Sequence, residues 1–226
     1  MVEIQKKLTP YNFTAMSNKK NLYIVVHYVG AVSTAKNNVD YYASQELNAS
    51  AHYFVDETSI WQSVEDFNRA LHCGGGLQGK NGHTFHGICT NSNSIGIEMC
   101  VKKTVSGTWY FSEKTVENTI DLVRHLMQKH NIPIDRVIRH YDVTGKNCPA
   151  PYVNESLWSE FKKRLTETKE LTTPNDIVWE LGYRGIVTDT KGMLEEMQAN
   201  PNGRLYWLAR KALKYIREHD CLNKYN

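Results

Sequence analysis

Two short apolar segments, each ending in a histidine, constrain the fold of this chain more than any other feature. Residues 21–27 are rich in β-branched and aromatic side chains and end at His27, which is the pattern of a buried strand. Residues 136–140 form a second, shorter pattern of this kind that ends at His140. Because α/β folds place ligands at the carboxyl ends of their strands, we expect both imidazoles at one functional edge.

The rest of the first 170 residues alternates between strand and helix patterns. Strands are predicted at residues 51–55, 60–64 and 94–101, and helices at 39–47, 112–131 and 156–169. Asn38 and Ser112 are the expected N-caps of the first two helices. The glycine-rich residues 74–82 predict a long flexible loop of the kind that often covers a cleft. This alternation is typical of an α/β fold.

A second, smaller region follows a polar stretch at residues 167–173. Pro174 suits the first position of a helix, and residues 193–199 and 205–216 predict two more helices. We therefore divide the chain into a first domain, residues 1–168, and a small C-terminal helical domain, residues 172–226.

Charge, apolar stretches and cysteine content argue against a nucleic-acid-binding protein, a membrane-spanning protein and a disulfide-stabilised secreted protein. The formal net charge of +3 is too small to predict a nucleic-acid-binding face, although it is compatible with an anionic polymer as partner. No stretch reaches the about 20 apolar residues of a membrane span, and the first residues show no secretory signal. The five cysteines are odd in number and scattered, which favours reduced thiols or a metal ligand over a disulfide framework.

Cys148 completes a candidate metal site with the two strand-end histidines. It lies eight residues after His140, in a loop that is able to fold back over the sheet edge. Two imidazoles and one thiolate suit tetrahedral Zn²⁺, with one position left for water, which is the usual arrangement of a catalytic zinc. The spacing alone is only moderately specific, since a single histidine is more often a surface or core residue.

Two further residues offer catalytic chemistry near such a metal. Glu98 lies within the predicted strand 94–101 on its polar side, where it is able to act as a general base toward water. A salt-bridged carboxylate at a sheet edge is an equally good reading of that pattern. Lys146 lies two residues before Cys148 and is able to stabilise an oxyanion, although an ordinary solvated lysine fits as well.

A thiol peptidase is a rival interpretation, with Cys148 as nucleophile and His140 as base. Pro149 directly follows the cysteine, which disfavours the helix N-terminus that activates many such thiols. A second rival is a binding protein without catalytic activity.

Four segments, taken together and in order, resemble a known family. They are YIVVH at 23–27, AHYFVD at 51–56, NSIGIE at 93–98 and RHYDVTGKNCP at 139–149. The chain resembles the zinc N-acetylmuramoyl-L-alanine amidases of phage endolysins, which share their fold with peptidoglycan recognition proteins. The resemblance covers roughly residues 20–165.

This resemblance implies a central mixed β-sheet flanked by helices, with Zn²⁺ in a groove. It implies that His27, His140 and Cys148 are the ligands, with Glu98 as catalytic carboxylate and Lys146 as transition-state stabiliser. The implied substrate bond joins the lactyl group of N-acetylmuramic acid to L-alanine in bacterial peptidoglycan. Non-catalytic relatives lack the thiolate ligand, whereas this chain has Cys148.

Departures from the family and its accessory positions give further expectations. Ala51 stands where some members have a tyrosine near the metal, and we interpret Glu98 as its replacement. His72 is expected to line the substrate groove or to have a structural role. His52 is expected to be a core or supporting histidine, and Asp142 either orients His140 or caps a turn.

The biological setting also follows from the resemblance. Endolysins commonly carry a wall-binding module, so residues 172–226 are expected to bind the cell wall, with the alternative that their aromatic residues fill a core. These are Trp179, Tyr183, Tyr206, Trp207 and Tyr215. We expect a monomer that waits in the host cytoplasm before lysis; a bacterial autolysin is the alternative.

Overall fold

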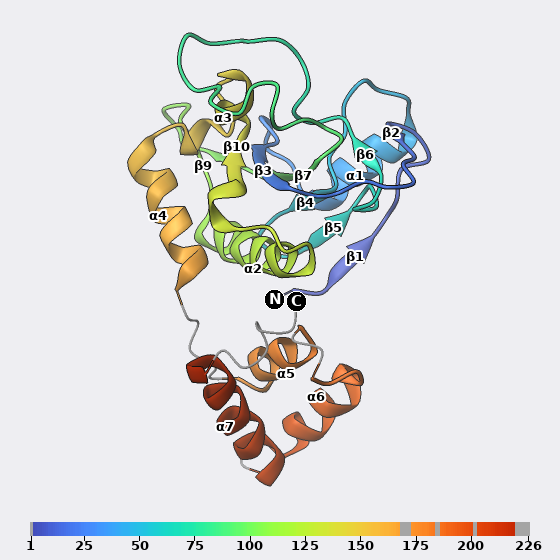
Figure 1. The fold of residues 1–226 in the computed structure, drawn as a ribbon, viewed down its shortest axis with the longest axis vertical. Helices are drawn as coiled ribbons and strands as arrows, with labels where there is room; N and C mark the ends of the chain where they lie inside the picture. Colours follow the sequence, from blue (N-terminus) through green and yellow to red (C-terminus); the bar gives the residue numbers. More distant parts are fainter. Residues whose placement is uncertain (1, 168–172, 184–185, 201–202, 220–226) are drawn as a thin grey trace. The chain divides into compact units, whose positions relative to one another are not determined.

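A computed structural model describes residues 2–167, 173–183, 186–200 and 203–219 of the chain. The described residues fall into two compact units, of which the first is Val2–Glu167. The described residues of the second unit form three helices (Figure 1).

The first unit is built on a six-stranded mixed sheet. Its strand order is β1 (Ile4–Lys6), β5 (Ile60–Gln62), β4 (Tyr53–Val55), β7 (Ser94–Met99), β3 (Tyr23–Tyr28) and β10 (Val137–Arg139). The neighbouring strands β4, β7, β3 and β10 run parallel to one another. Strand β5 pairs antiparallel with β4 on one side and parallel with β1 on the other. The predicted α/β fold with a central mixed sheet is confirmed.

Two small antiparallel strand pairs and four helices complete this unit. The pairs are β2 (Phe13–Thr14) with β6 (Arg69–Ala70) and β8 (Lys102–Lys103) with β9 (Trp109–Tyr110). The helices are α1 (Ala35–Ser44), α2 (Glu113–Lys129), α3 (His140–Thr144) and α4 (Glu155–Thr166), with 3₁₀ turns at Ile134–Arg136 and Ala150–Tyr152. Helix α2 packs against β3, β4 and β7, and α4 packs against α2.

One predicted helix cap is confirmed and the other is wrong. Ser112 caps α2 by accepting from the backbone N–H of Thr115. Helix α1 begins four residues before the predicted start, because Thr34 is its cap and accepts from the N–H of Asn37. Asn38 lies inside that helix, where its amide donates to the Thr34 carbonyl.

Strand alternation divides the sheet into two faces. His27 pairs with Glu98, and Glu98 pairs with Phe54, so these three side chains share one face. Phe54 on that face packs with Ala35 and Val39 of α1. The opposite face is the one on which α2 lies. The side chains of His27 and Glu98 therefore lie on the face of the sheet that α1 covers.

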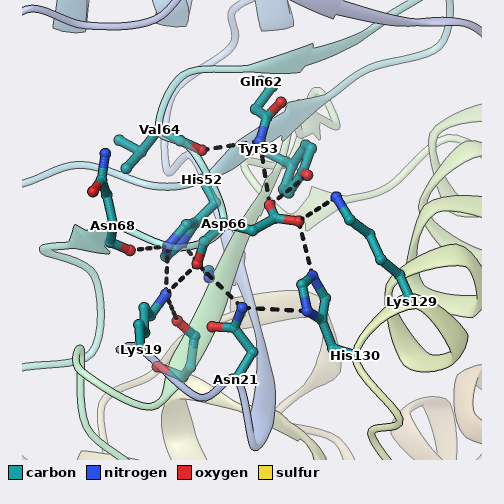
Figure 2. A network of polar contacts seen from close by, with 12 residues as sticks. Lys19, Asn21, His52, Tyr53, Gln62, Val64, Asp66, Asn68, Lys129 and His130 are labelled. Carbon is teal, nitrogen blue, oxygen red and sulfur yellow. Dashed lines mark hydrogen bonds and ion pairs between the residues drawn. The ribbon is translucent and has the colours of Figure 1, made fainter. Parts of the chain in front are cut away.

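A buried polar network centred on Asp66 links the sheet to α2 (Figure 2). Its carboxylate accepts from the Tyr53 hydroxyl at 2.6 Å and from Lys129 and His130 at 2.8 Å each. Burial opposes ionisation of Asp66, but the hydrogen bonds from His130, Lys129 and Tyr53 outweigh it and hold its pKa well below the usual value. Asp66 therefore ties β4 to the end of α2.

Lys19 lies in the same network and has an unusual set of partners (Figure 2). Its Nζ lies 3.0 Å from the Asp66 carbonyl oxygen, 2.8 Å from that of Ser94, and 2.9 Å from His52 Nε2. Burial lowers the pKa of Lys19 to about 8, against the opposing charge of Asp66. His52 itself is buried, and its Nδ1 accepts from the Gly96 N–H, as expected for a supporting core histidine.

The glycine-rich loop packs against α3 rather than extending freely. The Gln78 N–H donates to the Thr144 carbonyl at 2.7 Å, and the His83 N–H donates to the Tyr141 carbonyl at 3.0 Å. A Cβ at Gly79 would lie 2.5 Å from the Gly145 carbonyl oxygen, so the approach of the two backbones requires glycine. The loop predicted to be long and flexible is thus anchored beside the segment that carries Cys148.

The second unit contains α5 (Pro174–Tyr183), α6 (Thr190–Ala199) and α7 (Arg204–His219). Its core consists of Ile177, Val178, Leu181, Met197, Ala209 and Leu213. Tyr206 packs at the margin of this core, whereas Trp207 and Tyr215 are 55% and 58% exposed. The side chains of Trp179 and Tyr183 lie outside the described part of the structure. No helix in the described residues has the length and apolar character needed to cross a membrane.

Candidate metal centre

Strand pairing brings the two strand-end histidines together. His27 is the penultimate residue of β3, and His140 is the first residue of α3, directly after β10. The two strands are parallel neighbours in which Arg139 pairs with Val26. His27 follows Val26 and His140 follows Arg139, so the two histidines leave the strands at the same level of the sheet. The centroids of their rings lie 4.7 Å apart.

Cys148 returns to this point from the loop after α3. The Tyr141 N–H donates to the Cys148 carbonyl at 2.7 Å and holds the loop closed. The candidate ligand atoms of His27, His140 and Cys148 all lie within 4.8 Å of one another. Cys148 Sγ is 3.7 Å from His27 Nδ1, close to the roughly 3.6 Å that two such donors span around a tetrahedral zinc.

The chemistry of the three donors fits a metal ion. Burial is the main cause that lowers the pKa of His27 well below its usual value and that of His140 to about 4, so both imidazoles are neutral and offer lone pairs. His140 Nε2 is buried without a hydrogen-bond partner, which is unfavourable unless another group fills that role. Burial raises the pKa of Cys148 to about 12, so a metal ion must displace the thiol proton.

Glu98 lies beside the three donors on an interior strand. Strand β7 runs between β4 and β3, so the alternative of a carboxylate at a sheet edge is wrong. Desolvation raises the pKa of Glu98 to about 7, while the charge of Lys146 lowers it. Glu98 Oε2 is buried and has no hydrogen-bond partner, so this oxygen is available to bind a proton.

Lys146 acts electrostatically on the whole site. After burial, its positive charge is among the causes that lower the pKa values of His27 and His140, and it also lowers those of Glu98 and Cys148. The Lys146 side chain is itself exposed, so its charge acts on the site from the solvent side, and its role as transition-state stabiliser stays a prediction.

His72 is buried beside His27 rather than exposed at the surface of a groove. It is 9% exposed, and its two ring nitrogens lie 3.0 Å from His27 Nε2 and 3.2 Å from Ser94 Oγ. A contact with substrate stays a prediction. The sequence patterns did not single out Ser94, because its role depends on a partner 22 residues away.

Asp142 has the contacts of a turn cap. It accepts from the backbone N–H of Arg139 at 2.8 Å and forms an ion pair with the Arg139 guanidinium. Arg139 also donates to the Tyr152 carbonyl and pairs with Glu155. Sequence reasoning missed Arg139, which fixes the segment leading into His140 through these bonds.

Comparison with known proteins decides the family. Residues 17–151 match the family described as N-acetylmuramoyl-L-alanine amidase, and this stretch contains His27, Glu98, His140, Lys146 and Cys148. The chain belongs to this amidase family. The predicted resemblance is therefore confirmed.

Individual amidases are similar over the same region. The N-acetylmuramoyl-L-alanine amidase BlyA of Bacillus subtilis strain 168 is 36% identical over 151 residues, which are 62% of this chain and 40% of BlyA. The structure of PlyL is 29% identical with a TM-score of 0.59, and covers 75% of this chain and 100% of that one. A mutant endolysin from Bacillus subtilis is also 29% identical, with a TM-score of 0.58 and coverages of 73% and 99%. The match to the curated relatives spans about two fifths of their length.

The geometry of the site disfavours the thiol peptidase interpretation. The near neighbour of Cys148 Sγ is His27 Nδ1, whereas that hypothesis takes His140 as base. A thiol whose pKa is about 12 supplies little nucleophilic thiolate at neutral pH.

Proposed function

We propose that this chain hydrolyses the amide bond between N-acetylmuramic acid and L-alanine in peptidoglycan, with the help of Zn²⁺. The observation that carries the proposal is the convergence of His27, His140 and Cys148 in a chain of the amidase family. These three residues would hold the ion through two imidazole nitrogens and one sulfur. When bound, zinc supplies a water with a pKa of about 7 instead of 15.7.

Glu98 is the group proposed to move the proton. It shares a sheet face with His27 and has an unpartnered, buried oxygen. Near neutral pH, a carboxyl with a pKa of about 7 exchanges a proton readily in either direction. Glu98 accepts the proton of the attacking water and later donates it to the leaving amine of L-alanine.

Lys146 is proposed to stabilise the negative charge that develops on the scissile carbonyl oxygen. Its charge already acts on the pKa of Glu98 and of the candidate ligands. An ammonium held next to the reacting carbonyl lowers the barrier, because the charge that it stabilises exists mainly in the transition state.

The proposed partner is bacterial peptidoglycan, and the proposed biological role is that of a phage endolysin. The similarity to the Bacillus subtilis endolysin supports this role. In this role the protein is a monomer that remains in the host cytoplasm until lysis and then degrades the wall. The similarity to BlyA supports a wall amidase in general, and a bacterial autolysin is the second candidate.

A wall-binding role is proposed for the second unit. Trp207 and Tyr215 lie eight residues apart on α7 and are both more than half exposed. Lys211 Nζ lies 4.5 Å above the Trp207 ring, on the same helical face. Exposed aromatic rings beside a cation suit an anionic glycan polymer.

Mass spectrometry of digested sacculi tests the proposed reaction. The expected products carry free lactyl carboxylates on N-acetylmuramic acid and new amino groups on L-alanine. Activity should disappear with a chelator and return with Zn²⁺. New reducing sugars, or activity that resists the chelator, would overturn the proposal; the second result would instead favour a thiol enzyme.

A further inference from the structure

A continuous chain of hydrogen bonds runs from the metal centre into the protein. His27 Nε2 lies 3.0 Å from His72 Nδ1, and His72 Nε2 lies 3.2 Å from Ser94 Oγ. Ser94 Oγ lies 2.6 Å from the Thr90 carbonyl oxygen. All three side chains are at most 9% exposed, so solvent does not replace these partners.

The carbonyl of Thr90 fixes the direction of the whole chain. A carbonyl has no proton, so Ser94 must donate its hydroxyl proton to Thr90. The Ser94 oxygen is then free to accept a proton from His72 Nε2. With one ring proton, held on Nε2, His72 presents Nδ1 as an acceptor, and the partner of Nδ1 is then a proton on Nε2 of His27.

The consequence appears at the other nitrogen of His27. With the proton on Nε2, the Nδ1 atom has a free lone pair, and it is Nδ1 that lies 3.7 Å from Cys148 Sγ. We infer that His72 is a positioning residue for the metal ion: it selects the tautomer of His27 that directs a lone pair at the ion. This inference rests on the proposed zinc site.

The surrounding backbone holds His72 in place for this role. The N–H groups of His72 and Cys73 both donate to Asn91 Oδ1, at 3.0 and 2.8 Å. A Cβ at position 96 would lie 2.5 Å from Cγ of His72, so Gly96 leaves the space that the ring occupies. The rings of His27 and His72 are perpendicular, at a centroid distance of 5.1 Å.

Zinc affinity of the full chain, measured by competition with a chelator, tests the inference. The variant His72→Phe removes the acceptor and should weaken zinc binding about 10–100-fold. His72→Asn should recover most of the affinity, because its amide oxygen replaces Nδ1 as an acceptor. Ser94→Ala should produce a smaller loss. His86→Phe, at an exposed histidine, is the matched control and should bind zinc as the wild type does.

NMR of the metal-free, ¹⁵N-histidine-labelled protein provides a second readout that needs no activity. The expected spectrum shows both His27 and His72 protonated on Nε2, and Ser94→Ala should reduce the population of that tautomer. A wild-type His27 protonated on Nδ1 overturns the inference, as does a folded His72→Phe with wild-type zinc affinity. If the wild type itself binds no zinc, the proposed function fails instead.

Discussion

Glu98 on β7 and His27 on β3 occupy paired positions of adjacent parallel strands. Their side chains therefore leave the sheet on the same face, next to each other. This pairing places a carboxyl group directly beside a candidate zinc ligand in a desolvated environment. The desolvation that raises the pKa of Glu98 suits the proposed role of a proton carrier near pH 7, but it also destabilises the ionised folded protein.

Replacing Glu98 by glutamine should separate catalysis from metal binding. Glu98→Gln removes only the proton-transfer role, so the turnover number should fall about 10²–10⁴-fold. Zinc affinity should stay close to that of the wild type, because the three donors remain. Peptidoglycan turnover and chelator competition on the same preparation measure the two effects. A fully active variant would show that the assignment of the base is wrong.

The same substitution should change how stability depends on pH in the metal-free protein. The pKa of Glu98 is about 7 in the folded state, above its ordinary value of 4.5. Between these values the folded protein binds more protons than the unfolded chain, so the free energy of unfolding falls as pH rises from about 4.5 to about 7. Glu98→Gln lacks this fall and should be more stable than the wild type at pH 8, by about 1–3 kcal/mol.

Urea unfolding of both proteins at several pH values measures this difference. Nearly equal stability of the two proteins at pH 5 serves as the internal control, because Glu98 is mostly protonated in the folded protein at that pH and the cost of burying its charge is small. A difference that is the same at pH 5 and pH 8 contradicts the assigned pKa shift.

Cys148→Ser should remove most of the zinc affinity. The thiolate is the softest of the three donors, and an alcohol is a poor replacement because its proton is far harder to displace. Cys100→Ser is the matched control, since Cys100 is also a buried thiol but lies in the cluster beside α1. Zinc content after dialysis should be much reduced for Cys148→Ser and unchanged for folded Cys100→Ser. Equal zinc content in both variants would exclude Cys148 as a ligand.

Lys19 should titrate near pH 8 in the folded protein, below its ordinary value of 10.5. Between these values the unfolded chain binds the extra proton, so the contribution of Lys19 to stability rises with pH across this window. Below about pH 8 this pH dependence is absent, because Lys19 is charged in both the folded and the unfolded protein. Lys19→Met lacks this dependence, so its stability relative to the wild type should decline between pH 8 and pH 10, by on the order of 2 kcal/mol. A constant difference over that range contradicts the prediction.

Wall binding should depend on the exposed aromatic face of α7. The double variant Trp207→Ser and Tyr215→Ser in the full chain should sediment less with purified sacculi than the wild type. Both side chains are exposed, so the free energy of unfolding should change little. Substitution of Leu208, which is 45% exposed on the same helix, to Ser is the control. Unchanged sedimentation of the double variant would argue against wall binding by this face.

The segments of secondary structure were largely predictable, because their determinants are local. A run of β-branched and aromatic residues predicted β3, alternation of apolar residues predicted β7, and the side chain of Ser112 identified the start of α2. The cap of α1 was predicted wrongly, since Thr34 and Asn38 both have capping side chains and local sequence does not decide between them. The anchoring of the glycine-rich loop on α3 was missed, because its partners are backbone carbonyls of a distant segment.

The sequence by itself determined which chemical groups are available: two imidazoles at strand ends, a thiol in a loop and a carboxyl group within a strand. Only the tertiary structure decided that they meet, because the distance between His27 and Cys148 depends on which strands pair and in which register. It also decided the protonation of each group, through burial and through partners such as His72 and Ser94 that are remote in the chain. Desolvation and hydrogen-bond direction are properties of the folded surroundings, so local sequence does not encode them.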